Sequence, residues 1–400
     1  MENYHKHSYG SNVFTPDSVV SAESYAKRAV ELGQKTICSV EHGWQGKYHE
    51  YYEMAQKYGL KFIFGTEAYW VKDRHSTDKT NGHIIILAKN EEGRQEINDM
   101  LSTANEDGYY YKPRVDPELI FKLTPQNVFI TSACVAFWKY DDIECFVKQL
   151  HEFFGENFML EIQNHNTKKQ IELNKRIKKL ATQYKIKLIA GLDSHYIYPE
   201  QTQDRDEYLK SKAIHYEDED GWYMDYPDEK TAFDRFMNQG IWNEEEIFQA
   251  MNNSNILLTF EDYDSEVFKK NRKLPTLYPD KTQEEKNAIY GHLITKLFRE
   301  YTKGMPPEEY DKYYKGVKIE VDTYKETGMV DYPLLDYSIV KRGLEKGGII
   351  TATGRGSAVG YFTNTLCGFS KVDRFKAPIK LYPERFISKA RILETNSLPD

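Results

Sequence analysis

Residue types that bind metal ions recur along the first two hundred residues of the sequence. His5-Lys6-His7 places two imidazoles two residues apart near the N-terminus. In an extended segment alternate side chains point to the same side, so both imidazoles can serve one cation. A mixture of imidazole, carboxylate and thiolate is typical of sites for zinc or a similar transition metal. The candidates further along the chain are His42, Glu67, His83, Cys134, Asp193 and His195.

Each candidate lies at the end or the beginning of an expected strand. Short apolar runs alternate with amphipathic stretches, which predicts strands separated by helices and therefore a parallel sheet or barrel. His5 and His7 are expected at the end of a first strand. Because sites in parallel barrels assemble at the carboxyl ends of the strands, we expect the candidates to converge there. The expected strands span residues 36–40, 62–64, 84–87, 128–130, 158–162 and 188–190, and the expected helices 22–32, 49–58 and 168–184.

Taken one at a time, these residues have simpler interpretations. A single Cys134 after an apolar strand is more often a small core residue. Glu67 alone can be a surface carboxylate or a helix cap, and His83 alone can be structural. Recurrence at successive strand ends favours a shared metal site over these separate roles, because chance explains such a pattern poorly.

A second region of possible chemistry is rich in Gly and Ser. Gly354-Arg355-Gly356-Ser357 follows a strand-like run, GIITAT, and precedes an apolar, helix-like run. Backbone N–H groups at such a turn attract phosphate, and Arg355 adds a planar double donor. A turn needed only for tight packing is the alternative interpretation. Residues 371–391 hold seven Lys and Arg against two acidic residues, which favours contact with a DNA backbone or a triphosphate.

The bulk properties limit the classes of protein to consider. A chain of 400 residues predicts more than one domain. The net charge of −8 argues against binding of nucleic acid by the whole surface. The four cysteines form no CxxC pair, and we find neither a signal peptide nor an apolar run long enough to span a membrane. We therefore expect a reduced, cytoplasmic setting without a membrane partner.

The order of the motifs resembles that of the PHP family, the polymerase and histidinol phosphatase module. The HxH pair is followed by a DHG-like turn at residues 41–43, a GxEAY-like run around Glu67, and then HxxLLA-like, SxC and DxHY runs. The run GYYYKPRVD at residues 108–116 resembles the GFYYKPRID segment of bacterial replicative polymerases. Residues 317–332, 353–366 and 371–400 resemble the beginning of the palm in DNA polymerases of the III alpha type.

This resemblance implies a fold, a division into domains and a set of metal ligands. It implies an α/β fold: a distorted (β/α)7 PHP barrel over residues 1–200, a mainly helical connector over 201–315 and the beginning of a polymerase palm over 316–400. It also implies two or three divalent ions, of zinc, manganese or iron, in the barrel. One ion would be held by His5, His7, Glu67 and Asp193, a second by Glu67, His83 and Cys134, and a third by His42, His195 and Asp17.

Two positions stay open in this assignment. Asn12 competes with Asp17 for the third ion, because this chain has a short insertion after the HxH pair. Glu41 stands where the family has the Asp of its DHG turn, and its role is left open. The resemblance further implies that the catalytic residues are Glu67, Asp193 and His195.

The implied function is that of the N-terminal part of a replicative DNA-directed DNA polymerase, with 3′–5′ exonuclease or phosphoesterase activity in the PHP domain. Residues 354–357 would bind the triphosphate of an incoming dNTP. Primer-template DNA, replisome proteins such as a sliding clamp, and magnesium at the polymerase site are the implied partners and cofactor. Asp400 is the first Asp of a PDxDxD-like pattern, so we expect no polymerisation by this stretch alone. The alternatives are a stand-alone PHP phosphatase and an inactive scaffold held together by metals.

Overall fold

The structure is a computed structural model that describes residues 1–215, 221–263, 275–351 and 356–395. The chain divides into two compact units, Met1–Lys269 and Lys270–Asp400, and each unit is described by itself. The predicted boundaries near residues 200 and 315 remain predictions. Within the described residues, no helix combines the length and the apolar character needed to cross a bilayer.

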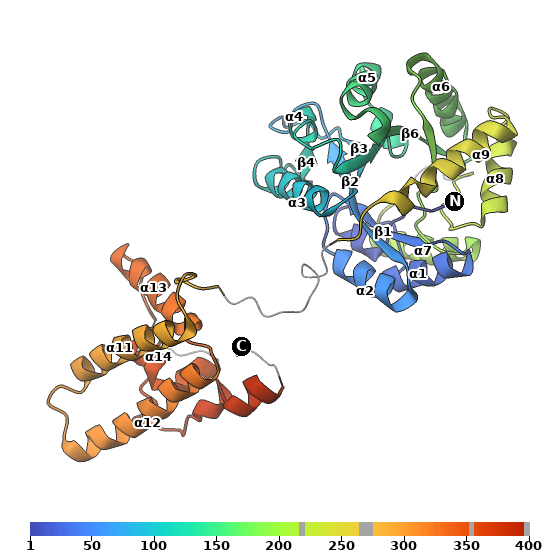
Figure 1. The fold of residues 1–400 in the computed structure, drawn as a ribbon. Coiled ribbons are helices and arrows are strands. Elements are labelled where there is room, and N and C mark those ends of the chain that lie inside the picture. The colour runs from blue at the N-terminus through green and yellow to red at the C-terminus, as the bar shows by residue number, and fades with distance from the viewer. Residues whose placement is uncertain (216–220, 264–274, 352–355, 396–400) are drawn as a thin grey trace. The chain divides into compact units, whose positions relative to one another are not determined.

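The first unit is built around a curled sheet with helices outside it, which confirms the α/β class. Every strand expected here from the apolar runs is present, and the strand order is β1-β2-β3-β5-β6-β7, with β4 beside β2. Figure 1 shows the strands at the centre of this unit and the helices around them. The strands are β1 (Thr36–His42), β2 (Lys61–Trp70), β3 (Gly82–Ala88), β4 (Arg114–Val115), β5 (Val128–Thr131), β6 (Phe158–Gln163) and β7 (Leu188–Gly191).

The expectation of an all-parallel sheet is wrong at β3. This strand runs antiparallel to both β2 and β5, whereas the other neighbouring strands are parallel. Between β2 and β3 the described residues form a loop without a crossover helix, and a crossover is what a parallel pair needs. The reversal puts His83, at the beginning of β3, opposite Tyr69 near the end of β2. The beginning of β3 therefore reaches the same edge of the sheet as the end of β2.

The expected first strand is also absent. Residues 5–7 form only an isolated parallel bridge, which joins Lys6 to Ser194. The backbone N–H of His7 donates to the carbonyl of Ser194 at 2.8 Å, and Ser194 N–H donates to the carbonyl of His5 at 3.2 Å. The HxH spacing still brings both imidazoles to one place, as predicted, because His5 and His7 contact Asp193 at 3.1 and 3.4 Å.

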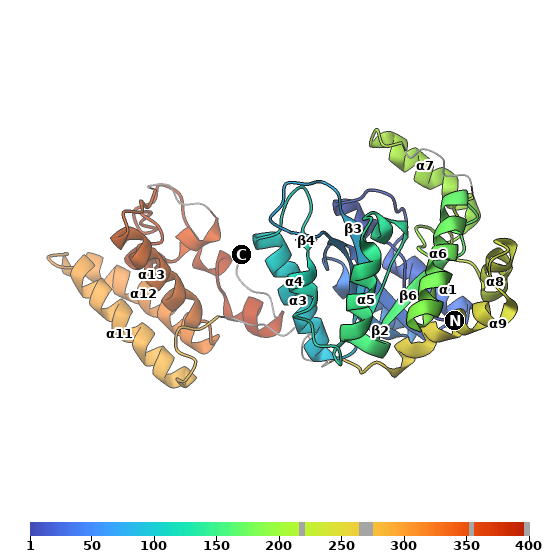
Figure 2. The same cartoon turned by 90° about the horizontal axis from the view of Figure 1, so that it is seen from above.

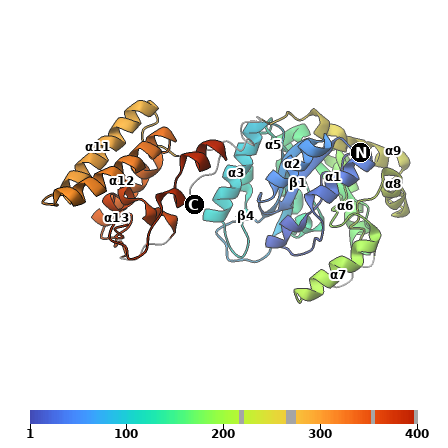
Figure 3. The same cartoon turned by 90° about the horizontal axis from the view of Figure 1, so that it is seen from below.

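Several helices begin where polar residues cap them. Ser21, Asn90 and Thr167 each accept a hydrogen bond from the backbone N–H three residues on, which satisfies a donor that the first turn leaves unpaired. Figure 2 and Figure 3 show the same helices from above and below, with α7 extending away from the sheet. The α-helices among the described residues of this unit are α1 (Ala22–Glu31), α2 (Tyr48–Tyr58), α3 (Glu91–Glu106), α4 (Pro117–Ile120), α5 (Ile143–Phe154), α6 (Lys168–Tyr184), α7 (Thr202–Ser211), α8 (Glu229–Asn238) and α9 (Glu244–Asn253).

Alternate strand residues separate into two buried clusters. On β3, Ile84 and Ile86 belong to the large cluster that also contains helix residues, whereas Ile85 and Leu87 belong to a smaller inner cluster. Because side chains alternate along a strand, the inner face continues to the strand ends and carries the polar residues of the site below. Other members of the inner cluster are Val40 of β1, Ile63 of β2 and Met159 of β6.

The second unit is helical in its first part, as expected. Aromatic side chains dominate its core, including Tyr290, Tyr313, Tyr324 and Phe362. In its described residues the α-helices are α11 (Gln283–Tyr301), α12 (Pro307–Glu326), α13 (Asp331–Glu345) and the short α14 (Phe362–Leu366).

The strand expected for GIITAT is not found in its described part, residues 348–351. Ile349 is 89 % exposed. The described residues of the second unit contain no other strand that could pair with this segment. An extended segment without a neighbour cannot satisfy its backbone groups within a sheet, so strand propensity alone did not produce a strand.

Candidate metal centre

The first group of predicted ligands meets where residues 5–7 lie beside the segment that follows β7. His5 Nε2 and His7 Nε2 lie 3.1 and 3.4 Å from Asp193 Oδ1. The carboxylate of Glu67, from β2, lies 3.5 Å from His5 Nε2 and 3.3 Å from His7 Nε2. The four residues assigned to one ion are therefore close neighbours.

Glu67 also joins this group to a second one. Its Oε1 lies 3.1 Å from His83 Nδ1, and Cys134 Sγ lies 3.4 Å from the same nitrogen. His42 Nδ1 approaches Glu67 Oε2 at 2.6 Å. Since Cys134 contacts both His83 and Glu67, it is more than a small core residue.

The third group contains Asp17, His195 and His42. Asp17 Oδ2 lies 3.2 Å from His195 Nε2 and 3.7 Å from His42 Nε2. Asn12 instead serves the loop, because its Oδ1 accepts from the backbone N–H groups of Asp17 and Ser18 at 2.9 and 3.0 Å. The geometry thus turns Asp17, and not Asn12, toward the histidines.

Several of these converging atoms form close contacts with one another but make no hydrogen bond. Within the described residues, the following atoms are buried without a hydrogen bond: His5 Nε2, His7 Nε2, Asp17 Oδ1, Glu67 Oε2 and both ring nitrogens of His42. Leaving a buried polar atom without a hydrogen bond costs about 1–3 kcal/mol, so such a concentration of them favours a ligand that satisfies them. Divalent cations would satisfy these atoms together, and the mixed donor set fits zinc or a similar transition metal.

Three histidines are oriented by contacts at their other ring nitrogen. His5 Nδ1 lies 2.6 Å from Glu161 Oε1, and His7 Nδ1 lies 3.0 Å from Ser11 Oγ. His195 Nδ1 lies 2.9 Å from its partner, the backbone carbonyl two residues earlier. When Nδ1 carries the proton and donates it in this way, Nε2 keeps a lone pair for a cation.

Glu161 is a residue of the site that the sequence reasoning missed. Its carboxylate accepts hydrogen bonds from His5, from Tyr4 Oη at 2.7 Å and from Gln163 Nε2 at 2.9 Å. A signal was available, because Glu161 stands two residues after Met159 in an apolar strand and therefore shares its inward face.

The structure also gives Glu41 a role. Its buried carboxylate accepts from the hydroxyls of Ser8 and Ser11, the latter at 2.5 Å. The residue in place of the family's Asp therefore ties down the segment that follows the HxH pair. Through Ser11 it also supports the orientation of His7.

Neighbouring histidines lower the pKa of two carboxylates in the site. Burial raises the pKa of Glu67, but His83 and His42 more than offset this and bring it well below its usual value. Burial likewise raises the pKa of Asp193, and His5 lowers it to well below the usual range. Burial, together with the charges of Glu67 and Asp193, raises the pKa of Cys134. A thiolate at Cys134 therefore requires a bound cation.

The centre opens into a cavity of about 270 Å³. Two residues beside it have left-handed backbone: Ala133, with φ of 45°, and Asp193, with φ of 48°. This conformation is costly for residues other than Gly and clusters at functional sites. The cavity is lined by Thr15, Asp17, His42, His83, Cys134, Asp193, His195, Arg205, Trp222 and Met224.

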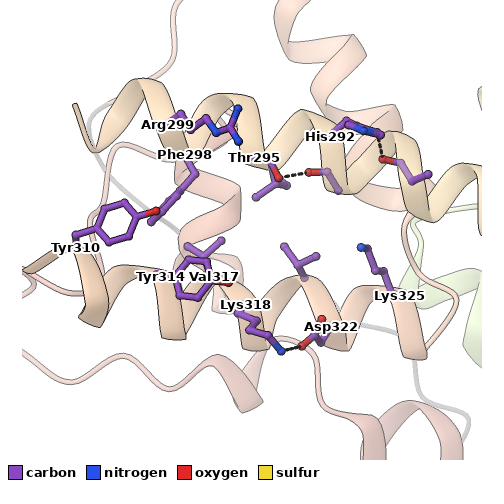
Figure 4. Close-up of a pocket in the computed structure, with 14 residues that line it drawn as sticks. His292, Thr295, Phe298, Arg299, Tyr310, Tyr314, Val317, Lys318, Asp322 and Lys325 are labelled. Carbon is purple, nitrogen blue, oxygen red and sulfur yellow. Dashed lines mark hydrogen bonds and ion pairs between the residues drawn. The ribbon is translucent and has the colours of Figure 1, made fainter. Parts of the chain in front are cut away.

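The second unit contains a larger cavity, of about 530 Å³, between α11 and α12. Figure 4 shows Lys318 paired with Asp322 on the same helix, at 2.9 Å, and His292 bonded to the backbone of α11. The described side chains of this cavity form none of the metal-type groupings found in the first unit. Although this cavity is larger than the one at the metal centre, it is therefore not a candidate metal site.

A further cavity of about 510 Å³ contains the described part of the Gly-rich segment. Gly356 has φ of 79°, a conformation that favours Gly. Gly354 and Arg355, predicted to bind a triphosphate, lie outside the described residues, as does Asp400. The polar and charged residues lining the cavity include Ser357, Lys380, Tyr382 and Arg385.

Comparison with known families assigns a different family model to each of the two units. Residues 3–165 match the model of the PHP domain, so the first unit contains a PHP domain. Residues 290–400 match the model described as the bacterial DNA polymerase III alpha NTPase domain. The chain thus carries a PHP domain followed by a domain of the polymerase III alpha type. The second match argues against a stand-alone PHP phosphatase.

Curated relatives are named DNA polymerase III subunit alpha. This chain is 26 % identical to that of Aquifex aeolicus over 96 % of its own length and 34 % of the relative. It is 24 % identical to that of Helicobacter pylori over 94 % of its own length and 33 % of the relative. For Thermus aquaticus the identity is 25 %, over 91 % of this chain and 35 % of the relative. The chain spans about a third of the length of these relatives.

Solved structures show a weaker likeness. A protein from Bifidobacterium adolescentis, described as a putative metal-dependent phosphoesterase, has a TM-score of 0.32 and 14 % identity, and the match covers 48 % of this chain and 87 % of that one. An amidohydrolase from Chromobacterium violaceum has a TM-score of 0.31 and 14 % identity, over 52 % of this chain and 96 % of the other. At these TM-scores the likeness carries no argument about function.

Proposed function

We propose that this chain is part of a replicative DNA-directed DNA polymerase and that its PHP domain is a metal-dependent phosphodiesterase. The observation that carries the proposal is the convergence of nitrogen, oxygen and sulfur donors, several of them buried without a hydrogen bond, on an open cavity. If the metal ions only held a scaffold together, the site would need the donor atoms but not the cavity that opens beside them. The domain of the polymerase III alpha type in the same chain supports DNA as the substrate.

The proposed centre holds two or three divalent ions of zinc, manganese or iron. When bound, such ions activate a water molecule and stabilise the leaving oxygen of a phosphodiester. Glu67 lies within 3.5 Å of donors from the first two ligand sets, which supports its role as a bridge. The ligand sets are those implied by the sequence: His5, His7, Glu67 and Asp193 for one ion, Glu67, His83 and Cys134 for a second, and His42, His195 and Asp17 for a third.

The chain's own residues prepare this centre. Glu161 and Ser11 orient two of the histidines from behind. Burial lowers the pKa of His195, but Asp17 raises it above its usual value, so a cation binding there must displace a proton. We assign the catalytic roles to Glu67, Asp193 and His195; the last two line the cavity into which a phosphodiester would enter.

Removal of nucleotides from a DNA 3′ end is the proposed reaction, because a polymerase works on that end. The test uses the whole chain, loaded in turn with zinc, manganese or iron, and single-stranded DNA labelled at its 5′ end. We expect successive shortening by the wild type, and loss of that activity in His7→Ala. His75→Ala is the matched control, since His75 is exposed and lies outside the groupings of metal-type donors. No shortening beyond the His7→Ala background with any of these metals would leave the scaffold alternative.

The second unit is proposed to bind the triphosphate of a dNTP at residues 354–357. Lys380 and Arg385 line the same cavity as Gly356 and Ser357, and cations there would neutralise phosphate charge. Titration with a fluorescent dNTP should give weaker binding to Arg385→Ala than to Lys341→Ala, whose exposed lysine lies on α13. Equal binding by the two variants would contradict this assignment. Magnesium at the polymerase site, primer-template DNA, a sliding clamp and a cytoplasmic setting remain predictions from the resemblance.

A further inference from the structure

One part of the cavity at the metal centre is apolar. Most of its lining consists of ligand-type or polar side chains, but Trp222 and Met224 contribute an indole and a thioether. Neither side chain is a usual ligand for zinc, manganese or iron of the kind that imidazole and carboxylate provide. The presence of a large aromatic ring beside a phosphodiester site therefore needs a separate explanation.

The segment that carries Trp222, residues 221–226, is fixed to the rest of the site by its backbone. The carbonyl of Gly221 accepts from Asn166 N–H at 2.8 Å, and the carbonyl of Met224 accepts from His195 N–H at 2.8 Å. The backbone N–H of residue 226 donates to the carbonyl of residue 197 at 3.0 Å. Because its backbone is held on both sides, Trp222 is positioned before any ligand arrives, which lowers the entropy cost of binding.

His165 supports the indole. The two ring centroids lie 4.5 Å apart, with 51° between the ring planes. His165 Nδ1 accepts a hydrogen bond from Tyr223 N–H at 3.0 Å, and burial lowers the pKa of His165 to about 3. A neutral, fully buried ring thus packs against Trp222 from within the protein, while part of the half-buried indole lines the cavity.

We propose that Trp222 is a platform on which the terminal nucleobase of a DNA strand stacks while the adjoining phosphodiester occupies the metal centre. This inference rests on the proposed function and specifies its substrate class. The substrate is a DNA strand whose terminal nucleotide carries a base, and not a small phosphate ester. Stacking on an aromatic side chain tolerates every base, because each has a π-face. The volume of the cavity, about 270 Å³, lies slightly below the range of usual small-molecule pockets, which favours a single terminal residue over a longer stretch of the strand.

Binding is measured first, because it does not depend on turnover. The probe is single-stranded DNA with 2-aminopurine at its 3′ end and a non-hydrolysable terminal linkage, mixed with the whole chain. Stacking on Trp222 should quench the fluorescence of the probe. We expect Trp222→Ala to lose the quenching and to bind the probe about 5- to 150-fold more weakly, the range that stacking of one base contributes. Trp222→Phe should keep most of both effects.

A matched control separates this effect from a general loss of aromatic surface. Phe248→Ala removes an exposed ring on α9 that does not line the cavity, and it should quench and bind as the wild type does. Equal quenching by Trp222→Ala and the wild type, or no quenching by the wild type, overturns the platform. If Trp222→Ala fails to fold, quenching by the wild type and Trp222→Phe is compared on a probe whose 2-aminopurine lies one nucleotide further inside; equal quenching at both positions overturns it as well.

Turnover gives a second readout that distinguishes this inference from the proposed function. The substrates are two DNA strands that differ only in the terminal residue, a normal nucleotide or an abasic analogue. The wild type should prefer the normal end by about 5- to 150-fold in kcat/KM, and Trp222→Ala should lose the preference. Absence of hydrolysis with either strand would count against the nuclease alone, and the quenching experiment would still decide the platform. Equal hydrolysis of both strands by the wild type would overturn the platform and leave the nuclease.

Discussion

Substitution of Glu161 gives the sharpest test of how this metal centre is held together. Its two oxygens serve different partners. Oε1 faces His5 Nδ1 at 2.6 Å and Gln163 Nε2 at 2.9 Å, whereas Oε2 accepts from Tyr4 Oη at 2.7 Å and Thr131 Oγ1 at 3.2 Å. The hydroxyls can rotate to accept a hydrogen bond, but a His5 Nδ1–H cannot.

Glu161→Gln should therefore settle with its amide oxygen toward His5 and its NH₂ group toward the hydroxyls. It keeps the hydrogen bond to His5 but removes the negative charge. A hydrogen bond to a charged group contributes about 1.5–3 kcal/mol, against about 0.5–1.5 for a neutral one. The difference of about 1–1.5 kcal/mol corresponds to about 5- to 13-fold in metal affinity. Glu161→Ala removes the contact itself and should approach the upper end of the roughly 10- to 100-fold loss of metal affinity that is typical when a residue hydrogen-bonded to a ligand is removed.

The assay is competition for metal between the chain and a chromophoric chelator, at fixed pH, with circular dichroism to establish that each variant is folded. Glu172→Gln is the control, because Glu172 is an exposed residue of α6 whose carboxylate pairs with Lys175 on the same helix. Wild-type affinity in a folded Glu161→Ala variant would refute the reasoning. So would equal losses in Glu161→Gln and Glu161→Ala, since the ranking follows from the hydrogen bond to His5.

Three other results are expected. Removal of metal by a chelator should lower the thermal unfolding temperature of the first unit, because a cation that binds only the folded state stabilises it. Metal at about a hundredfold excess over Kd would restore about 2.7 kcal/mol, and an unchanged melting curve would contradict this. Asp17→Asn should bind fewer ions at saturation, by elemental analysis, whereas Asn12→Asp, which keeps the acceptor for the loop, should bind as many as the wild type. An unchanged number of ions in Asp17→Asn would contradict the assignment of the third site to Asp17. In the second unit, burial raises the pKa of Glu320 above 4.5 although Arg374 opposes it. The unfolded chain therefore releases the Glu320 proton at a lower pH than the folded chain does. The contribution of Glu320 to stability consequently falls as the pH rises from 4.5 through its folded-state pKa. Glu320→Gln should flatten that part of the pH dependence in denaturant unfolding, and an unaltered slope would show that another group causes it.

The strands and several helices were accessible from local patterns. In the first unit, every strand predicted from an apolar run is present, and only the strand expected at residues 5–7 is absent. The predicted helix 168–184 coincides with α6. Burial explains this success, because strands covered on both faces must be almost continuously apolar. The same runs failed at GIITAT, where the described residues offer no neighbouring strand. Local propensity can thus suggest a strand, but only a partner can complete its hydrogen bonds.

The sequence by itself determined which donor types this protein has and the order in which they follow its strands. Only the tertiary structure decided their grouping. It reversed β3 so that His83 meets Glu67, turned Asp17 toward His195, and placed Glu161 behind the first histidine. Strand direction, loop conformation and contacts between residues more than a hundred positions apart depend on how the whole chain packs, and no local pattern encodes that packing.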